Sequence, residues 1–410
     1  MVSNAVEVRN ITEEEVPAYI TAMEAGFHHV TRDGIVDWLR RHIEVDKTHA
    51  AFDGSAVVGT SRWFETDLTV PGGTLPAAAV TEVTVTATHR RRGLLTQMMA
   101  AERDDFVSRG IAVAILIAAE APIYGRFGYG MATEDATLTI SVPMTQFTVA
   151  APSGTVRRTT PAELVAEGPA VFDRFRLSSP GEIERKPLWW DYLINRPPNE
   201  EKKPGEEFHV LRRDADGVVD GFASYRVRGE WEDRIPNGTL EIDDLIATSD
   251  DAYVALWQHC TSVDWVRRVK APGRPPVEPL PFLLTDRRAA TQKVRGDFVW
   301  LRILDPAAAL AARTYEVDDR LVLKVVDKFG GPARGTFVVD GGPKGASSEE
   351  SRAKPDLTVE VADLGSAYLG GTPLWPAAFA GRVKEHRSGA VAAFDRMFGT
   401  TVAPWCTTGF

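Results

Sequence analysis

The chain has 410 residues, of which 44% are hydrophobic and 25% are charged, a balance typical of globular rather than disordered proteins. This length exceeds what one hydrophobic core usually supports, so we expect about two to four domains. The 57 acidic and 47 basic side chains give a formal net charge of −10, which disfavours a nucleic-acid partner and favours a cationic one.

The first ten residues lack a basic segment followed by an apolar core, and no apolar run reaches the length of a membrane span. We therefore expect a cytoplasmic protein without a membrane partner, and leave open a non-classical route of export. Only two cysteines, Cys260 and Cys406, are present, far apart in the sequence. This pattern predicts neither a disulfide framework nor a cysteine-based metal site, and we expect no metal.

The first predicted elements are a strand at 6–9 and a helix that ends near Ala25. Thr12 followed three residues later by Glu15 has the pattern of a helix capping box. The helix is therefore expected to begin directly after Thr12.

The most informative segment begins with a strand that ends at Val83-Thr84-Val85 and continues into the arginine-rich turn Arg90–Gly93. Apolar residues at helical spacing then predict a helix over 94–107, and an apolar run of strand length covers 111–118. The first backbone N–H groups of a helix have no partner within it. Together with the helix dipole and nearby arginines, these groups attract phosphate. The turn therefore indicates a ligand that carries a pyrophosphate.

This order of elements, with R-x-x-G at Arg90–Gly93, resembles the acetyl-coenzyme A site of the GNAT superfamily of N-acetyltransferases. The segment Ile123–Gly130 resembles the end of that superfamily's fourth helix and the turn into the next strand. Together, the two segments resemble the enhanced-intracellular-survival (Eis) branch, and the resemblance extends over the whole chain.

The resemblance implies an α+β fold. It consists of two tandem GNAT domains, each a mixed, mostly antiparallel twisted sheet with flanking helices, and a C-terminal sterol-carrier-protein-like α/β domain. We assign residues 1–145 to the catalytic domain, 146–290 to a degenerate second GNAT domain and 291–410 to the third domain. Small and turn-forming residues at 151–154 lie near the first boundary. No second R-x-x-G turn follows the strand predicted at 241–247, so the second domain is expected to be non-catalytic.

Helical and strand signals continue through the second and third segments. The predicted helices are 162–177, 251–263, 307–312 and 390–398. The predicted strands are 208–212, 221–227, 241–247, 321–326, 335–340 and 356–361. The polar, proline-rich stretch 196–205 is predicted to be a mobile surface loop.

The resemblance also implies the cofactor site for acetyl-CoA. Backbone groups of Val83, Thr84 and Val85 are expected to hold the pantetheine and polarise the thioester carbonyl, with Ala119 and Glu120 on the neighbouring strand. The residues expected around the pyrophosphate are Arg91, Arg92, Gly93, Leu94, Leu95 and Thr96.

Acetyl transfer to an amine requires a neutral amine and a proton for the leaving thiolate. A lysine-like amine at pH 7 lies about 3.4 units below its pKa, so neutralising it costs about 4.6 kcal/mol. The resemblance implies Tyr124 as the general acid and the C-terminal carboxylate of Phe410 as the general base. Pro404, Trp405 and Phe410 provide apolar anchors, which predict a docked C-terminal tail. If the carboxylate is not the base, an internal base is needed, and the residues to test are Glu82, Glu120 and His29.

The resemblance implies direct acetylation of amines on aminoglycoside-like antibiotics, peptides or protein lysines, by a homohexamer. Phe27 and Trp38 are either walls of the acceptor pocket or core residues. Histidines follow Phe27, and Gly409 adds no carboxylate beside the terminus, which weakens the aminoglycoside assignment. The alternative is a non-catalytic scaffold or apolar-ligand-binding protein that uses its sterol-carrier-like domain.

Overall fold

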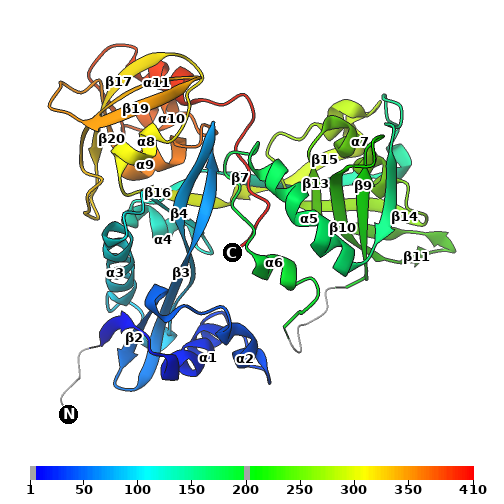
Figure 1. The fold of residues 1–410 in the computed structure, drawn as a ribbon, viewed down its shortest axis with the longest axis horizontal. Helices are drawn as coiled ribbons and strands as arrows, with labels where there is room; N and C mark the ends of the chain where they lie inside the picture. Colours follow the sequence, from blue (N-terminus) through cyan, green and yellow to red (C-terminus); the bar gives the residue numbers. More distant parts are fainter. Residues whose placement is uncertain (1–5, 198–203) are drawn as a thin grey trace.

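The computed structural model describes residues 6–197 and 204–410, which form three lobes (Figure 1). The first lobe is blue to cyan, the second mostly green, and the third yellow to red. The red C-terminal tail returns from the third lobe and ends between the first and second lobes. No helix among the described residues is long and apolar enough to cross a membrane.

The first lobe is built on a mixed sheet with the strand order β1-β2-β3-β4-β5-β16-β6. Only β4 and β5 run parallel, and the other neighbours are antiparallel. The strands are β1 (Glu7–Asn10), β2 (Thr48–Asp53), β3 (Ala56–Val70), β4 (Gly73–Val85), β5 (Val113–Ile117), β16 (Val299–Ile303) and β6 (Gly130–Met131). The helices are α1 (Val16–Gly26), α2 (Ile35–Arg40), α3 (Leu94–Ser108) and α4 (Ala121–Tyr124).

Local signals in the sequence correctly predicted the beginning of this lobe. Thr12 and Glu15 form the expected capping box, in which the Thr12 backbone N–H donates to the Glu15 carboxylate at 2.9 Å. It caps a short 3-10 helix that leads directly into α1. The predicted helix at 94–107 is α3, and the predicted strand at 111–118 contains β5.

Among its described residues, the second lobe contains a sheet in the order β15-β7-β14-β13-β10-β9-β8, a separate two-stranded hairpin, β11–β12, and three α-helices. The strands of the sheet are β7 (Glu134–Ser141), β8 (Thr155–Thr159), β9 (Glu206–Arg213), β10 (Val219–Arg228), β13 (Gly238–Ala247), β14 (Val266–Arg274) and β15 (Ala290–Asp297). The hairpin and helices are β11 (Trp231–Glu232), β12 (Ile235–Pro236), α5 (Pro161–Arg176), α6 (Pro187–Asp191) and α7 (Asp250–Thr261).

Two strands cross between the first and second sheets. Strand β7 follows the first lobe in sequence but lies between β15 and β14 in the second sheet. Strand β16 follows the second lobe in sequence but lies between β5 and β6 in the first sheet. Sheet membership therefore does not follow chain order here, and the ranges 1–145, 146–290 and 291–410 stay a prediction.

The third lobe is a sheet in the order β19-β18-β17-β20-β21, with four helices. Its elements are α8 (Pro306–Ala311), β17 (Asp319–Val326), β18 (Gly335–Gly342), β19 (Gly345–Glu350), β20 (Leu357–Glu360), α9 (Val361–Ala367), α10 (Trp375–Phe379), β21 (Lys384–Glu385) and α11 (Ala390–Phe398). Helix α9 packs tightly against β6 and β16. A Cβ at Gly130 would lie 1.8 Å from the Ala362 carbonyl oxygen, and one at Gly365 would lie 2.3 Å from the Leu301 carbonyl oxygen. One apolar core therefore joins the first and third lobes.

Most of the predicted elements in the second and third segments are present, with bounds that differ by a few residues. Of the predicted loop at 196–205, residues 198–203 lie outside the described part of the chain. Cys260 and Cys406 are both buried and unpaired. Burial raises the pKa of the Cys260 thiol to about 12, so this cysteine stays a protonated core residue.

Candidate active site

The end of β4 carries an irregularity in its pairing with β3. Thr60 pairs with Thr84 and Arg62 with Thr81, so two residues of β4 lie opposite one residue of β3. Glu82 lies in this bulge with a φ of 58°, a strained value for a residue with a side chain. The bulge turns the backbone of Val83–Val85 away from a regular strand path.

Strands β4 and β5 pair in parallel only over Ala77–Val80 and Val113–Leu116 of the described residues. Beyond these pairs, the backbone of Val83–Val85 is not used by β5. Because parallel neighbours end at the same edge of a sheet, Val83–Val85 lies at the same edge as the segment after β5. Ala119 and Glu120 are exposed in that segment.

The turn before α3 has the geometry of an anion site. Arg91 has a φ of 63° and Gly93 a φ of 79°, and Gly93 is the N-cap of α3. The first intrahelical bond runs from the Gln97 N–H to the Gly93 carbonyl, at 3.1 Å. The N–H groups of Leu94, Leu95 and Thr96 therefore lie in the first turn, where helices leave donors for a ligand.

Exposed arginines surround this turn. Arg90, Arg91 and Arg92 are all exposed, and the Arg92 guanidinium donates to the Thr88 carbonyl at 3.3 Å. Arg90 approaches the Glu120 carboxylate at 3.9 Å, which connects the turn to the segment after β5. Free donors and positive charge fit a pyrophosphate, and the open backbone of β4 fits an extended amide chain such as pantetheine. The residues present therefore fit acetyl-CoA.

Tyr124 is the last residue of α4, directly after β5, and is 8% exposed. Its ring lies edge-on to Tyr129, with 6.2 Å between the ring centroids. Burial raises the pKa of Tyr124 to about 12, and the nearby carboxylates of Glu102 and Glu120 add to the rise. The phenol therefore keeps its proton at neutral pH and can only donate it.

The C-terminal tail, residues 404–410, is docked between the lobes, as its apolar anchors predicted (Figure 1). The Phe410 ring packs edge-on against Phe64 of β3, with 5.8 Å between centroids. Trp189 of α6 also contacts Phe64, at 5.6 Å, and its indole N–H donates to the Gly409 carbonyl at 3.2 Å. The first lobe thus holds Phe410 through Phe64, and the second lobe holds Gly409 through Trp189.

The two residues predicted to line the pocket of the acceptor amine differ in their surroundings. Phe27 caps α1 and is 41% exposed. Trp38 of α2 contacts Tyr192 at 6.0 Å between ring centroids, and its indole N–H donates to the Asn195 carbonyl at 3.0 Å. Trp38 therefore joins the first lobe to the loop after α6.

The three alternative internal bases have different environments. The Glu82 carboxylate accepts from Arg62 at 2.6 Å and from the Tyr19 hydroxyl at 3.1 Å. The side chains of Glu120 and His29 are 64% and 68% exposed. Glu82 is already paired with a guanidinium, and the other two face solvent.

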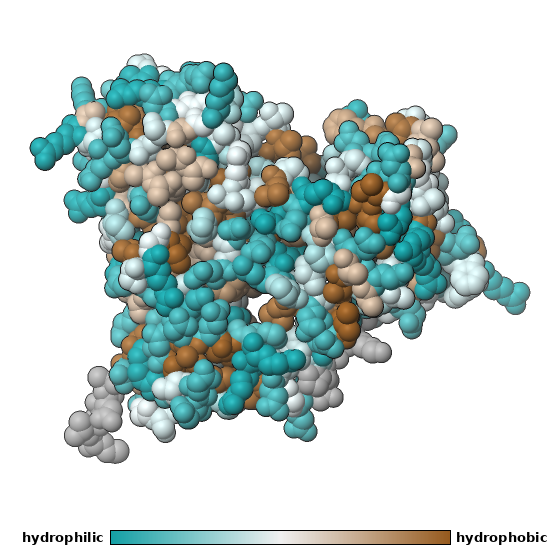
Figure 2. All heavy atoms as spheres, in the orientation of Figure 1, coloured by the Kyte–Doolittle hydropathy of each residue, from teal (hydrophilic) through white to brown (hydrophobic). Residues whose placement is uncertain are grey.

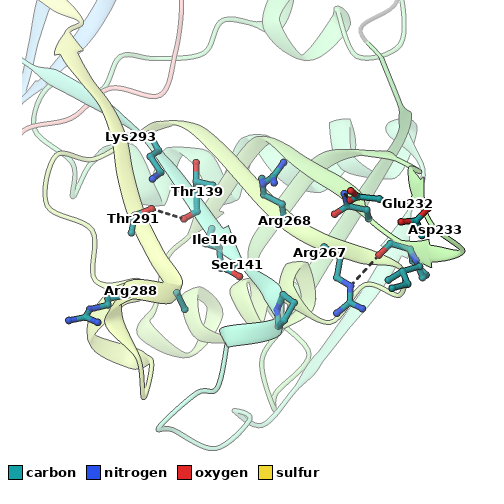
Figure 3. A pocket seen from close by; sticks show the side chains of 15 residues that line it. Thr139, Ile140, Ser141, Glu232, Asp233, Arg267, Arg268, Arg288, Thr291 and Lys293 are labelled. Atoms are coloured by element: carbon teal, nitrogen blue, oxygen red, sulfur yellow. Dashed lines mark hydrogen bonds between the residues drawn. The ribbon is translucent and has the colours of Figure 1, made fainter.

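A cavity of about 740 Å³ opens on the second lobe, beside β7, β14, β15 and the β11–β12 hairpin (Figure 3). Its charged lining residues are Glu232, Asp233, Arg267, Arg268, Arg288 and Lys293. None of the predicted site residues lines it, so this cavity is separate from the predicted chemistry. Among the described residues there is also no cluster of three or more His, Cys, Asp or Glu that could hold a metal ion.

Three families match consecutive parts of the chain. A family described as an acetyltransferase (GNAT) domain matches residues 7–132, and a second family with that description matches 181–303. A sterol carrier protein domain matches 306–407. The chain thus has two tandem GNAT domains and a C-terminal sterol-carrier-like domain, and GNAT acetyltransferases use acetyl-CoA. These domains define the class of protein as an N-acetyltransferase.

Relatives narrow the class to one family. The chain is 37% identical to an uncharacterized N-acetyltransferase from Streptomyces avermitilis, over 99% of both chains. It is 36% identical to the N-acetyltransferase Eis from Mycobacterium tuberculosis, over 85% of both chains. The crystal structure of Eis1 from Mycobacterium abscessus matches with a TM-score of 0.85 and 31% identity, over 98% of this chain and 100% of that one. The chain belongs to the Eis-like N-acetyltransferases, and a non-catalytic scaffold is not favoured.

Proposed function

We propose that this enzyme transfers the acetyl group of acetyl-CoA directly to an amine of aminoglycoside-like molecules, peptides or protein lysines. The observation that carries the proposal is the docked C-terminal tail, whose last residue packs on Phe64 of the catalytic domain. A tail that only stabilises the fold could be held by its apolar anchors alone. This tail is instead held along its length and ends against the strand that pairs with β4.

Bound acetyl-CoA supplies an acetyl group activated as a thioester. Backbone groups of Val83, Thr84 and Val85 align the pantetheine and donate to the thioester carbonyl oxygen, with Ala119 and Glu120 on the facing segment. Residues 91–96 hold the pyrophosphate through N–H groups and arginine charge. The end of β4 supports this role, because Thr84 and Val85 pair with β3 on one side while the described pairing with β5 ends at Val80.

The C-terminal carboxylate of Phe410 takes the proton from the acceptor amine. A free α-carboxylate is a weak base, so its position in the interior matters, since partial burial raises its basicity. Tyr124 then gives a proton to the leaving thiolate. Its pKa, raised to about 12 by burial, keeps the phenol protonated until the thiolate forms.

The acceptor amine enters over the first helices, beside Phe27 and Trp38. Cationic acceptors suit the chain's net charge of −10, which raises their concentration near the molecule. The proposal is tested by measuring coenzyme A release from acetyl-CoA with a panel of aminoglycosides, polyamines and lysine peptides. Turnover with none of these amines would refute the proposed acceptor classes.

Removing the charge of Arg91 or Arg92 should raise the apparent KM for acetyl-CoA by about two- to fivefold each, with kcat little changed. Both side chains are exposed, so the effect should be largest at low ionic strength. Steady-state kinetics of Arg91→Ala and Arg92→Ala at two salt concentrations measure it. Arg320→Ala, at an exposed position in the third lobe, is the control. An equal KM increase with a small acetyl thioester that lacks phosphates would contradict pyrophosphate recognition.

We also propose that the enzyme is a cytoplasmic homohexamer. Trp231 and Trp265 support a subunit contact, because they are 63% and 70% exposed and lie together, with 6.0 Å between ring centroids. Glu232, which follows Trp231 in the sequence, and Arg267, two residues after Trp265, line the charged cavity of the second lobe (Figure 3). Sedimentation at micromolar concentration should give about six times the chain mass of 44.9 kDa. A monomer in that experiment would contradict the proposal.

A further inference from the structure

The segment 180–185 of the second domain lies between the first domain and the C-terminal tail. On one side, the Thr69 N–H donates to the Glu182 carbonyl at 2.8 Å and the Glu184 N–H donates to the Asp67 carbonyl at 3.0 Å. On the other side, the Trp405 N–H donates to the Pro180 carbonyl at 2.9 Å. The segment therefore connects strand β3, which carries Phe64, to the tail that ends at Phe410.

Glu182 holds the tail through a fully buried carboxylate. One carboxylate oxygen accepts from both the backbone N–H and the hydroxyl of Thr407, at 2.7 and 2.8 Å. The other accepts from the Ile183 N–H at 3.1 Å and from the Cys406 thiol at 3.3 Å. A buried carboxylate this well satisfied fixes the residues that it contacts, because moving them would leave it unpaired.

Arg185 holds the next residues of the tail. Its Nε donates to the Thr408 hydroxyl at 3.0 Å, and one Nη donates to the Thr407 hydroxyl at 2.9 Å. Its other Nη forms an ion pair with Asp244 of β13, and the guanidinium lies over the Phe172 ring at 4.0 Å from the centroid. The planar fork of arginine is thus fixed on three sides, and two of its donors are used on the tail.

We propose that Glu182 and Arg185, which we call the clamp, are positioning residues that set where the terminal carboxylate lies. Glu182 and Arg185 hold Thr407 and Thr408, which lie three and two residues before Phe410, and Trp189 holds the Gly409 carbonyl. The proposal rests on the proposed function, in which that carboxylate takes the proton from the amine. Its chemical basis is that a proton acceptor displaced by about 1 Å can cost a hundredfold in rate.

The clamp is tested with Arg185→Met, which keeps the length of the side chain and removes its donors. The control is Arg212→Met in the same domain, because Arg212 is also buried and paired with an aspartate, Asp220, but does not contact the tail. We expect Arg185→Met to lower kcat by about ten- to a hundredfold with the KM for acetyl-CoA within about twofold. Arg212→Met should change thermal stability comparably and leave kcat within about twofold.

A second variant keeps the test decisive if Arg185→Met does not fold. Thr408→Val removes the hydroxyl that Arg185 contacts and keeps the shape and charge of a residue that is 2% exposed. Like Arg185→Met, it should lower kcat with little change in the KM for acetyl-CoA. A kcat loss in Arg185→Met or Thr408→Val no larger than in Arg212→Met would overturn the clamp.

The clamp and the proposed function are separated by adding two glycines after Phe410, alone and together with Arg185→Met. If the clamp acts through the terminal carboxylate, Arg185→Met should cause no further loss of residual activity in the glycine-extended enzyme. A loss in that enzyme as large as in the natural one would refute the clamp. Full kcat in the glycine-extended enzyme alone would refute the carboxylate mechanism. If the glycine-extended enzyme is inactive and the Arg185→Met enzyme is fully active, the clamp is refuted and the carboxylate mechanism is not.

Discussion

Adding a few residues after Phe410 is expected to lower kcat by about a hundredfold or more, the contribution typical of a positioned general base. The addition keeps every side chain of the enzyme but replaces the terminal carboxylate with a neutral amide and moves the negative charge away. The fold and coenzyme binding should survive, because no core residue changes. Steady-state turnover with and without a C-terminal tag, together with acetyl-CoA binding by calorimetry, measures both effects.

Two further variants separate the carboxylate from the phenyl ring. Deletion of Phe410 removes both the correctly placed carboxylate and the packing on Phe64, so it should be as inactive as the tagged enzyme. Phe410→Ala keeps a carboxylate on the same residue and should lose less activity than either. A tagged enzyme with full turnover would show that the base is internal, and Glu82, Glu120 and His29 would then be tested.

Tyr124→Phe is expected to lower kcat by about ten- to ten-thousandfold while the Kd of coenzyme A changes little, because the phenol acts only on the leaving thiolate. The substitution removes one oxygen from a residue that is 8% exposed, so the packing against Tyr129 is retained. Single-turnover rates and coenzyme A titration separate the chemical step from binding.

The matched control for Tyr124→Phe is Tyr129→Phe, which removes a hydroxyl from the neighbouring buried ring and should leave kcat within about tenfold. Because the pKa of Tyr124 is raised to about 12, its own titration should not limit the rate below about pH 10. Unchanged turnover in Tyr124→Phe would assign the acid role to another residue or to water.

The turn before α3 was predictable because its signals are local, and its phosphate-binding role stays a prediction. The end of the strand at Val83–Val85, the arginines, Gly93 and the helix after it all lie between Val83 and Ser108, and each has a conformational preference of its own. The positive φ of Gly93 and the start of α3 at Leu94 agree with that pattern. Docking of the tail was also predictable, because Trp405 and Phe410 are poor residues for a free terminus.

The partners that hold the tail were not predictable from the sequence. The partners of the tail lie more than 200 residues before it and belong to no motif; they are Phe64, Arg185 and Trp189. From the sequence alone, any other arginine or tryptophan was an equal candidate for contact with the tail. Their role appears only when β3 and α6 are brought together. The bulge at Glu82 was missed for a related reason, since an irregular strand is defined by its pairing with β3 and not by its own residues.

Strand pairing joins segments of the lobes that are far apart in the sequence. The face seen in Figure 2 is mostly hydrophilic, with apolar side chains showing in the hollows between the lobes. Long-range pairing of this kind gives no periodic signal to a single sequence. The crossing of β7 and β16 between the two sheets is the clearest case. Strand β7 has an ordinary alternating pattern and β16 is a short, mostly buried strand, and neither pattern indicates which strand it pairs with.

Because β7 and β16 cross between the sheets, the segments matched by the two GNAT families do not correspond to parts of the chain that could fold alone. A gene fragment that stops at residue 132 would encode a sheet without β16, and a fragment that covers 181–303 would lack β7. Each would be synthesised with an interior gap in its hydrogen-bonded ladder. The 181–303 fragment carries β16, but β7 (Glu134–Ser141) lies in neither family segment, so only a first piece that extends past Ser141 can fill the second gap. Fragment complementation, in which two inactive pieces assemble into one enzyme, therefore suits this chain better than dissection into autonomous modules.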